Sequence, residues 1–234
     1  MRRRDLPLIL FFGAFALGGI QWAYYEAIAR MPIGIALVIQ YLGALLMLVY
    51  LRWRGLRVGG RLWLAAVLAV LGTALLVGAY DPSVLASNVA GVPLAALAAL
   101  IFAVYFLTAE RILARYPVWT LLVYGFGAAL VAWAALRPPA LLPWSVLAEP
   151  TNAALMLGVV VVATVVPFAL IFASVSLIPA ARTGITSMAE PGFAAAAAWV
   201  ALGETLEWPQ VVGGAVVIAG IAIAQSLRPH EGSV

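Results

Sequence analysis

The chain has 234 residues, of which 66% are hydrophobic and 9% are charged, and its mean hydropathy is +1.11. An ordinary soluble domain has roughly 25% charged residues, so this composition excludes one and indicates a membrane protein. The net charge of +4 does not predict a nucleic-acid partner, because all thirteen basic residues are arginines placed at the ends of apolar stretches. The absence of cysteine excludes disulfides and thiolate metal sites.

Eight apolar stretches follow one another along the chain, and each is close to the length of about 20 residues that a helix needs to cross a bilayer. They are Leu6–Tyr25, Ile33–Leu51, Leu62–Tyr80, Val89–Ala109, Val118–Leu136, Ala154–Leu177, Thr183–Leu202 and Pro209–Leu227. A transmembrane barrel would instead show segments of about ten residues with alternating polarity. We therefore predict an all-α membrane protein of about eight transmembrane helices in one membrane domain.

The arginines between these stretches are distributed unevenly. If the N-terminus is cytoplasmic and the helices alternate in direction, eleven of the thirteen lie on the cytoplasmic side. These eleven are Arg2, Arg3, Arg4, Arg52, Arg54, Arg57, Arg61, Arg111, Arg115, Arg182 and Arg228. Only Arg30 and Arg137 lie on the other side. Cytoplasmic loops of membrane proteins are enriched in arginine and lysine, so we predict that both termini are cytoplasmic.

Two parts of the chain resemble each other at a nearly fixed spacing. The matched pairs are Pro32 with Pro179, Gly55 with Gly203 and Gly72 with Gly220, at offsets of 147 and 148 residues. Roughly residues 20–77 thus repeat at roughly 167–225. Each helix of the second copy comes five helices after its match in the first, and this odd offset inverts the second copy in the membrane. Inverted repeats are typical of secondary transporters, whose solute site lies between the repeats. The alternative is chance similarity among helices rich in alanine, leucine, valine and glycine.

Several short segments occur in an order that resembles the EamA repeats of the drug/metabolite transporter superfamily. They are the run from Tyr24 to Ala36, the run from Ile178 to Gly184, the Ala189-Glu190-Pro191 triplet and the run from Leu202 to Leu206. The resemblance covers nearly the whole chain and implies repeats of five helices each. On this pattern residues 1–80 are a partial N-terminal repeat of three helices, and residues 81–234 are a complete repeat of five.

The same resemblance implies a chain shortened at the N-terminus by about two helices. Either two helices have been lost, or the start lies inside a longer reading frame. The first copy also departs from the family pattern in two places. Ala44 stands where the family has a mid-helix proline, and Leu56 follows the turn glycine where the family has a glutamate. The larger departure is that eight helices stand where the family has ten, and it bears on autonomous transport more than on the fold.

The resemblance implies a multi-pass secondary transporter of the bacterial inner membrane that exports amino acids or related small organic solutes. Its expected partners are that solute and the lipid bilayer, with no nucleic acid, no cofactor, no bound metal and a possible homodimer. The alternative is a non-transporting remnant or a subunit of a larger membrane complex. An enzyme is disfavoured, because the chain has no cysteine and its single histidine, His230, lies in the polar tail.

Glu190 is the first candidate for a solute-binding residue. It lies in the middle third of the stretch Thr183–Leu202, where a charged side chain costs about 2.5–3.5 kcal/mol on insertion scales. Pro191 follows it and removes a backbone donor, which frees a carbonyl in the preceding turn. Such an acid is suited to bind a proton or the amine of a solute. The alternative is a protonated glutamate that only packs between helices.

Other polar and aromatic side chains inside the spans are further candidates for the solute site. They are Gln21, Trp22, Tyr25, Gln40 and Tyr41 on the first two helices, and Tyr105 and Tyr124 in the second half. Tryptophan and tyrosine near helix ends are usually interfacial anchors, which is the alternative for several of them. Glu26 precedes Arg30 by four residues, a spacing that predicts a surface ion pair.

Overall fold

The computed structural model describes residues 2–81, 89–203 and 205–227, so His230 lies outside the described residues. Within these ranges, seven helical stretches are long and apolar enough to cross a membrane. They are Arg3–Ile28, Ile33–Trp53, Val92–Leu113, Val118–Leu136, Pro150–Leu177, Ala180–Leu202 and Trp208–Ser226. A shorter apolar helix, Gly60–Leu76, corresponds to the remaining predicted span. The prediction of an all-α membrane protein with about eight spanning helices is confirmed.

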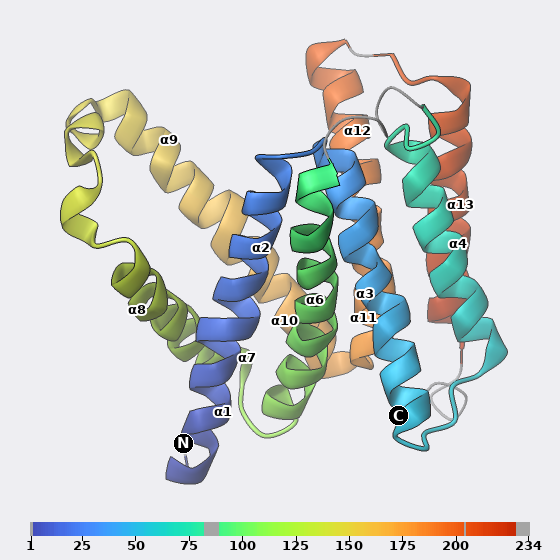
Figure 1. The fold of residues 1–234 in the computed structure, drawn as a ribbon, viewed down its shortest axis with the longest axis horizontal. Helices are drawn as coiled ribbons and strands as arrows, with labels where there is room; N and C mark the ends of the chain where they lie inside the picture. The colour runs from blue at the N-terminus through green and yellow to red at the C-terminus, as the bar shows by residue number, and fades with distance from the viewer. Residues whose placement is uncertain (1, 82–88, 204, 228–234) are drawn as a thin grey trace. The chain divides into compact units, whose positions relative to one another are not determined.

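The chain divides into two compact units that alternate along the sequence (Figure 1). The first unit comprises Met1–Gly19 and Thr108–Ile178, and the second comprises Ile20–Leu107 and Pro179–Val234. These boundaries differ from the predicted repeats, because a compact unit is defined by which helices pack together and a repeat by which helices are similar.

The first unit is built from short helical segments joined end to end into longer rods. Its elements are η1 (Arg3–Asp5), α1 (Leu6–Phe11), η2 (Phe12–Leu17), α7 (Val118–Thr120), η4 (Leu121–Gly125), α8 (Phe126–Leu136), η5 (Pro139–Leu141), η6 (Trp144–Ala148), α9 (Pro150–Val160), η7 (Val161–Val165) and α10 (Val166–Leu177). Three of them, η2, η4 and η7, are π-helical. A π-helical turn widens the helix locally and redirects the side chains that follow it.

Two of the π-helical segments meet where the chain has a glycine on each side. A Cβ atom built on Gly13 of η2 would lie 2.3 Å from the carbonyl oxygen of Gly125 at the end of η4. The backbones are therefore in direct contact at this point. Beside it, Phe12 packs edge-on against Phe172 of α10, with ring centroids 5.8 Å apart. This contact is the core of the first unit.

The second unit contains longer helices. Its elements are α2 (Gly18–Ile28), α3 (Ile33–Trp53), α4 (Gly60–Leu76), η3 (Val89–Gly91), α6 (Val92–Leu113), α11 (Ala180–Thr186), η8 (Ser187–Ala189), α12 (Glu190–Leu202) and α13 (Trp208–Ser226). Helix α2 begins in the first unit and α6 ends in it. A buried cluster of Ala27, Met31, Ile35, Ala36 and Ala95 packs the N-terminal part of α3 against α2 and α6.

Helices α4 and α13 lie side by side in the second unit (Figure 1). A Cβ atom on Gly72 would lie 2.8 Å from the carbonyl oxygen of Gly213. A Cβ atom on Gly220 would lie 2.8 Å from the carbonyl oxygen of Ala65. Gly72 and Gly220 are matched positions of the repeat, 148 residues apart, and so are Ala65 and Gly213. The second contact therefore joins the same two matched positions as the first, with each position supplied by the other copy. That exchange is the arrangement that an inverted repeat produces.

Glycines with positive φ end three helices of the second unit. Gly55 (φ +83°) follows α3, and Gly203 (φ +71°), its match in the repeat, follows α12. Such left-handed glycines terminate helices because other residues are strained there. Gly78 (φ +74°) does the same after α4, which is why this helix ends before Tyr80, where the sequence predicted the span to end.

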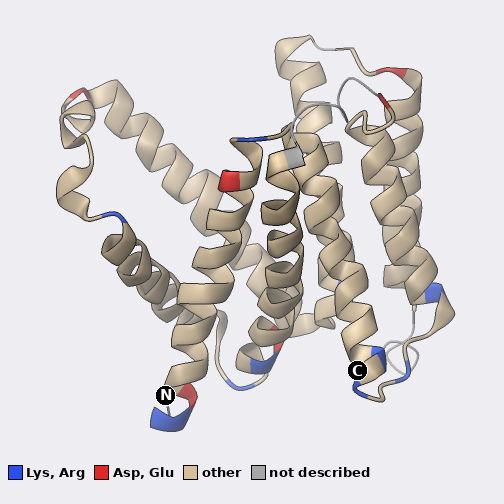
Figure 2. Ribbon diagram, viewed as in Figure 1, with Lys and Arg blue, Asp and Glu red and all other residues tan. Residues whose placement is uncertain are grey.

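Charged residues lie mostly at the ends of the helices in each unit. Figure 2 shows most of the arginines and acids at helix termini and in the turns. Helix α13 begins with a reciprocal cap, in which the backbone N–H of Glu207 donates to Gln210 Oε1 at 2.8 Å and the Glu207 side chain accepts in return. The predicted ion pair between Glu26 and Arg30 is present, with 2.5 Å between nitrogen and oxygen.

Candidate functional site

A proline interrupts the span Ala180–Leu202 near its middle and divides it into α11, η8 and α12. Pro191 has no backbone N–H, so it cannot donate to the carbonyl of Ser187 four residues earlier. That carbonyl accepts the N–H of Glu190 instead, three residues on, which is the tighter 3-10 pattern. The break in the helix therefore lies directly beside the Glu190 carboxylate.

Tyr41 of α3 reaches this break. Its hydroxyl group donates to Glu190 Oε2 at 3.2 Å and lies 3.4 Å from the carbonyl oxygen of Ser187. Tyr41 is 2% exposed, and its ring packs edge-on against Phe102 of α6, with centroids 6.0 Å apart. The tyrosine is therefore held in place by packing, while the Glu190 side chain remains exposed. Two candidates that the sequence singled out separately thus form one polar group.

Two further polar side chains belong to the same unit. Tyr24 of α2 lies within electrostatic range of Glu190 and of Tyr41. Gln40, next to Tyr41 on α3, has a buried Oε1 atom with no hydrogen-bond partner among the described residues. A buried amide oxygen without a donor is costly, so a donor from a solute or water is expected there. Tyr24 was not among the predicted site residues, and nothing in the local sequence distinguishes it from its neighbour Tyr25, which was.

The other predicted site residues lie in different surroundings. Gln21 donates to the hydroxyl of Tyr25 at 3.4 Å on α2. Trp22 is 40% exposed and Tyr25 is 53% exposed, which is typical of side chains that face lipid or headgroups. Neither makes a contact with Glu190 in the described part of the chain. These three residues form a polar and aromatic patch of their own.

The two tyrosines of the second half belong to different units. Tyr105 of α6 is 4% exposed and packs edge-on against Phe106, with centroids 5.1 Å apart. It belongs to the second unit, like Tyr41 and Glu190. Tyr124 lies in η4 of the first unit and is 47% exposed. Its exposed ring makes it a weaker candidate for the wall of a site.

Arg182 is a residue whose structural role the sequence did not reveal. The sequence places it at the cytoplasmic end of a span, and the structure places it in the first turns of α11, 6% exposed. Its guanidinium donates to the carbonyl of Ala224 at 2.7 Å and also to that of Leu227. These are terminal carbonyls of α13, where the helix dipole favours a cation. Arg182 therefore ties α11 to the end of α13.

The chemistry available around the helix break is that of hydrogen-bond acceptors. Glu190 offers a carboxylate and Ser187 a carbonyl, while Tyr41 can donate or accept. No group of three or more metal-ligating side chains occurs in residues 2–81, 89–203 and 205–227. An arrangement of acceptors around one carboxylate is suited to a cationic donor such as an ammonium group.

The family model of the EamA-like transporter family matches residues 89–225. The threonine/homoserine exporter RhtA of Salmonella typhimurium (strain LT2) is 32% identical over 222 residues, which are 93% of this chain and 70% of that protein. The protein of the same name from Escherichia coli (strain K12) is 29% identical over 234 residues, 98% of this chain and 75% of that protein. An uncharacterized transporter of Archaeoglobus fulgidus is 26% identical over 203 residues, 86% of this chain and 70% of that protein.

A solved crystal structure has the same fold. It superimposes with a TM-score of 0.72 at 21% sequence identity, covering 93% of this chain and 77% of that chain.

Proposed function

This chain belongs to the EamA-like transporter family, and from that membership we propose that it exports a small neutral amino acid of the threonine or homoserine type across the bacterial inner membrane. Glu190 receives the ammonium group of the solute. Tyr41 positions the carboxylate, and the observation that carries the proposal is the hydrogen bond between them at the break of the span. The chain acts as a carrier and not as an enzyme.

The chemistry of the solute supports this assignment. An amino acid at neutral pH carries one ammonium group, which has three donors and no acceptor. The Glu190 carboxylate and the Ser187 carbonyl are acceptors about one helical turn apart on the same chain segment. A hydrogen bond between an ammonium and a carboxylate is roughly twice as strong as one between neutral groups. Broken helices at the middle of a span form the solute sites of many secondary transporters.

The arrangement also supplies a step for release. When the ammonium group leaves, Tyr41 donates to Glu190 Oε2 through the 3.2 Å contact between them. The Glu190 carboxylate is thus never left without a donor. A proton from water can also bind to this carboxylate in place of the ammonium group. Exchange of an ammonium group for a proton at one carboxylate couples export to the proton gradient.

The proposal extends to orientation and assembly. Both termini are cytoplasmic, supported by the eleven-to-two division of the arginines. The chain forms a homodimer, supported by the exposed faces of the first unit, where α8 has no buried residue. Small residues along Val118–Leu136 permit close packing against another copy. The partners are the solute, the bilayer and a second copy, without nucleic acid.

Efflux of labelled threonine from loaded vesicles tests the site. Replacing Glu190 with glutamine (Glu190→Gln) keeps the size of the side chain but removes its charge. Because a hydrogen bond to a charged group contributes about 1.5–3 kcal/mol, efflux is expected to fall by about tenfold or more and to lose its dependence on external pH. Tyr41→Phe is expected to give a smaller loss.

The matched control is Glu26→Gln, which removes a carboxylate at the end of α2 that is paired with Arg30. Its efflux is expected to equal that of the wild type at equal amounts of protein in the membrane. Unchanged efflux from Glu190→Gln would place the solute elsewhere. Absence of threonine and homoserine efflux from the wild-type chain would instead overturn the assignment of the solute.

A further inference from the structure

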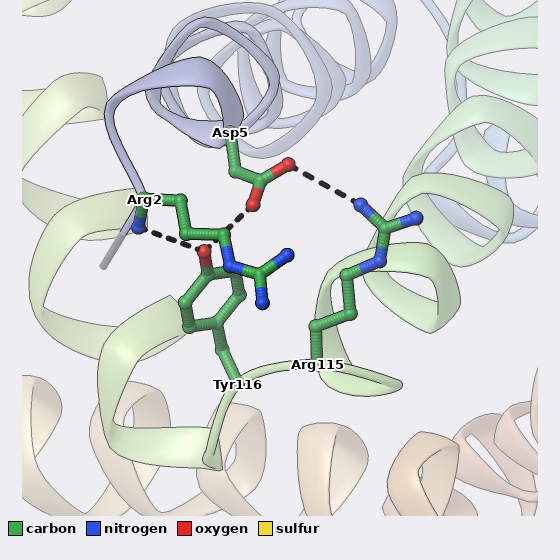
Figure 3. A pocket seen from close by; sticks show the side chains of 4 residues that line it. All are labelled: Arg2, Asp5, Arg115 and Tyr116. Atoms are coloured by element: carbon green, nitrogen blue, oxygen red, sulfur yellow. Dashed lines mark hydrogen bonds and ion pairs between the residues drawn. The ribbon is translucent and has the colours of Figure 1, made fainter.

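The first unit has an open cavity of about 490 Å³ where the N-terminal turn η1 meets the turn that follows α6. Figure 3 shows the four side chains that line it: Arg2, Asp5, Arg115 and Tyr116. All four come from the first unit. The cavity lies at the end of the rod that begins with α1, which is the end of a membrane span.

A partly buried carboxylate organises this cavity. Asp5 Oδ2 accepts a hydrogen bond from the Tyr116 hydroxyl at 2.7 Å, and Asp5 Oδ1 pairs with Arg115 at 3.2 Å. The Tyr116 hydroxyl in turn accepts the backbone N–H of Arg2 at 3.0 Å. The Asp5 side chain is 13% exposed. Both carboxylate oxygens are therefore used within the protein, and Asp5 forms the inner wall of the cavity.

The remaining charge of the cavity is positive. The guanidinium group of Arg2 makes no hydrogen bond or ion pair with any residue that the structure describes, and in Figure 3 it lies between Tyr116 and Arg115. The Arg115 side chain is 68% exposed, so most of its donors face outward. The charged residues of the two segments are Arg2, Arg3, Arg4, Asp5, Glu110, Arg111 and Arg115. Five arginines against two acids leave an excess of positive charge.

We propose that this cavity binds the phosphate group of an anionic lipid headgroup. Two guanidinium groups that line one recess match the oxygens of a phosphate, to which arginine donates in a bidentate manner. The cavity lies beside the start of α1, at the depth where headgroups lie. Trp119, three residues after Tyr116, is 70% exposed, as expected of an aromatic residue at the membrane interface. A headgroup is therefore a nearer source of phosphate than the solvent.

Native mass spectrometry of the full chain in mild detergent tests the proposal, with phosphatidylglycerol, phosphatidylcholine and inorganic phosphate as separate probes. Phosphatidylglycerol is expected to bind several times more tightly than phosphatidylcholine. Arg2→Gln is expected to weaken this binding about tenfold, since it removes a charge-assisted hydrogen bond to the phosphate. It leaves the fold of the cavity intact, because only the backbone of Arg2 contacts Tyr116.

Arg115→Gln is a second variant with the same expected direction, and Arg3→Gln is the matched control. Arg3 is exposed and adjacent to Arg2 but does not line the cavity, so its effect is expected to stay below twofold. Equal losses from Arg2→Gln and Arg3→Gln would mean diffuse attraction and overturn the proposal. Equal binding of the two lipids, or displacement of phosphatidylglycerol by millimolar inorganic phosphate, would overturn the assignment to an anionic lipid.

Discussion

The two units hold their helices together in different ways. In the second unit, α4 and α13 approach until backbone atoms touch at Gly72 and Gly213. In the first unit, α8 and α9 bury none of their residues, and only 6% of the apolar window in Pro150–Leu177 is buried. Lipid tails are as apolar as leucine, so an apolar helix gains little from burial against protein in a membrane. Close backbone approaches at small residues decide which helices pack closely, at Gly13 in the first unit and along the whole of α4 and α13 in the second.

The candidate site lies in the closely packed unit. Tyr41 and Glu190 meet between α3 and the start of α12, and Arg182 fixes α11, the segment just before the break, to the end of α13. A binding site needs side chains that are held in place by their surroundings. The loosely packed helices of the first unit offer their apolar surfaces to lipid or to a partner instead.

Removal of the Arg182 clamp is expected to have the largest effect on the stability of the second unit. Arg182→Gln withdraws a buried cation from the terminal carbonyls of α13. Hydrogen bonds to charged groups contribute about 1.5–3 kcal/mol, so the free energy of unfolding in detergent is expected to fall by about 2–3 kcal/mol. Thermal unfolding measures the loss, with Arg137→Gln as a control at an exposed position of the first unit. Equal stability of the two variants would show that the clamp contributes nothing.

The glycine contact between α4 and α13 gives the next largest effect, and the neighbouring glycine supplies its control. A Cβ atom at Gly213 would lie 2.5 Å from the backbone nitrogen of Leu76, whereas one at Gly214 would lie 3.8 Å from the Leu76 side chain. Gly213→Ala is expected to destabilise the protein by about 1–3 kcal/mol through overpacking. Gly214→Ala is expected to be neutral or slightly stabilising, since alanine favours helix over glycine by up to about 1 kcal/mol.

The same unfolding assay compares the two glycine variants directly. Equal melting temperatures for Gly213→Ala and Gly214→Ala would show that α4 and α13 separate readily. The second unit would then be no more tightly packed than the first.

Reporter fusions show on which side of the membrane a loop lies, and they test the predicted topology in both units. A reporter after Arg4, in the first unit, and one after Arg57, in the second, are both expected to be cytoplasmic. Fusions in residues 137–151 are expected to be periplasmic. The physical reason is the excess of arginine in cytoplasmic loops. Alkaline phosphatase and fluorescent protein fusions measure the side directly, and a periplasmic signal after Arg57 would contradict the predicted topology.

The sequence by itself determined the class of the protein and the place of its helices. Length and hydropathy of the apolar stretches predict the spans, because one bilayer thickness sets one helix length. Local chemistry also fixed the helix break, since Pro191 lacks the N–H that a continuous helix requires. The same holds for the helix ends at Gly55 and Gly203. These features depend on residues close together in the chain.

Only the tertiary structure decided which of the candidate residues meet. Tyr41 and Glu190 are 149 residues apart, and nothing in either local sequence indicates that one donates to the other. Arg182 similarly contacts carbonyls of a helix that ends more than 40 residues later. Helices that are apolar on every face can pack in many orders, since lipid satisfies their surfaces equally well. The contacts that select one order are backbone approaches at small residues and a few polar pairs, and these exist only between folded helices.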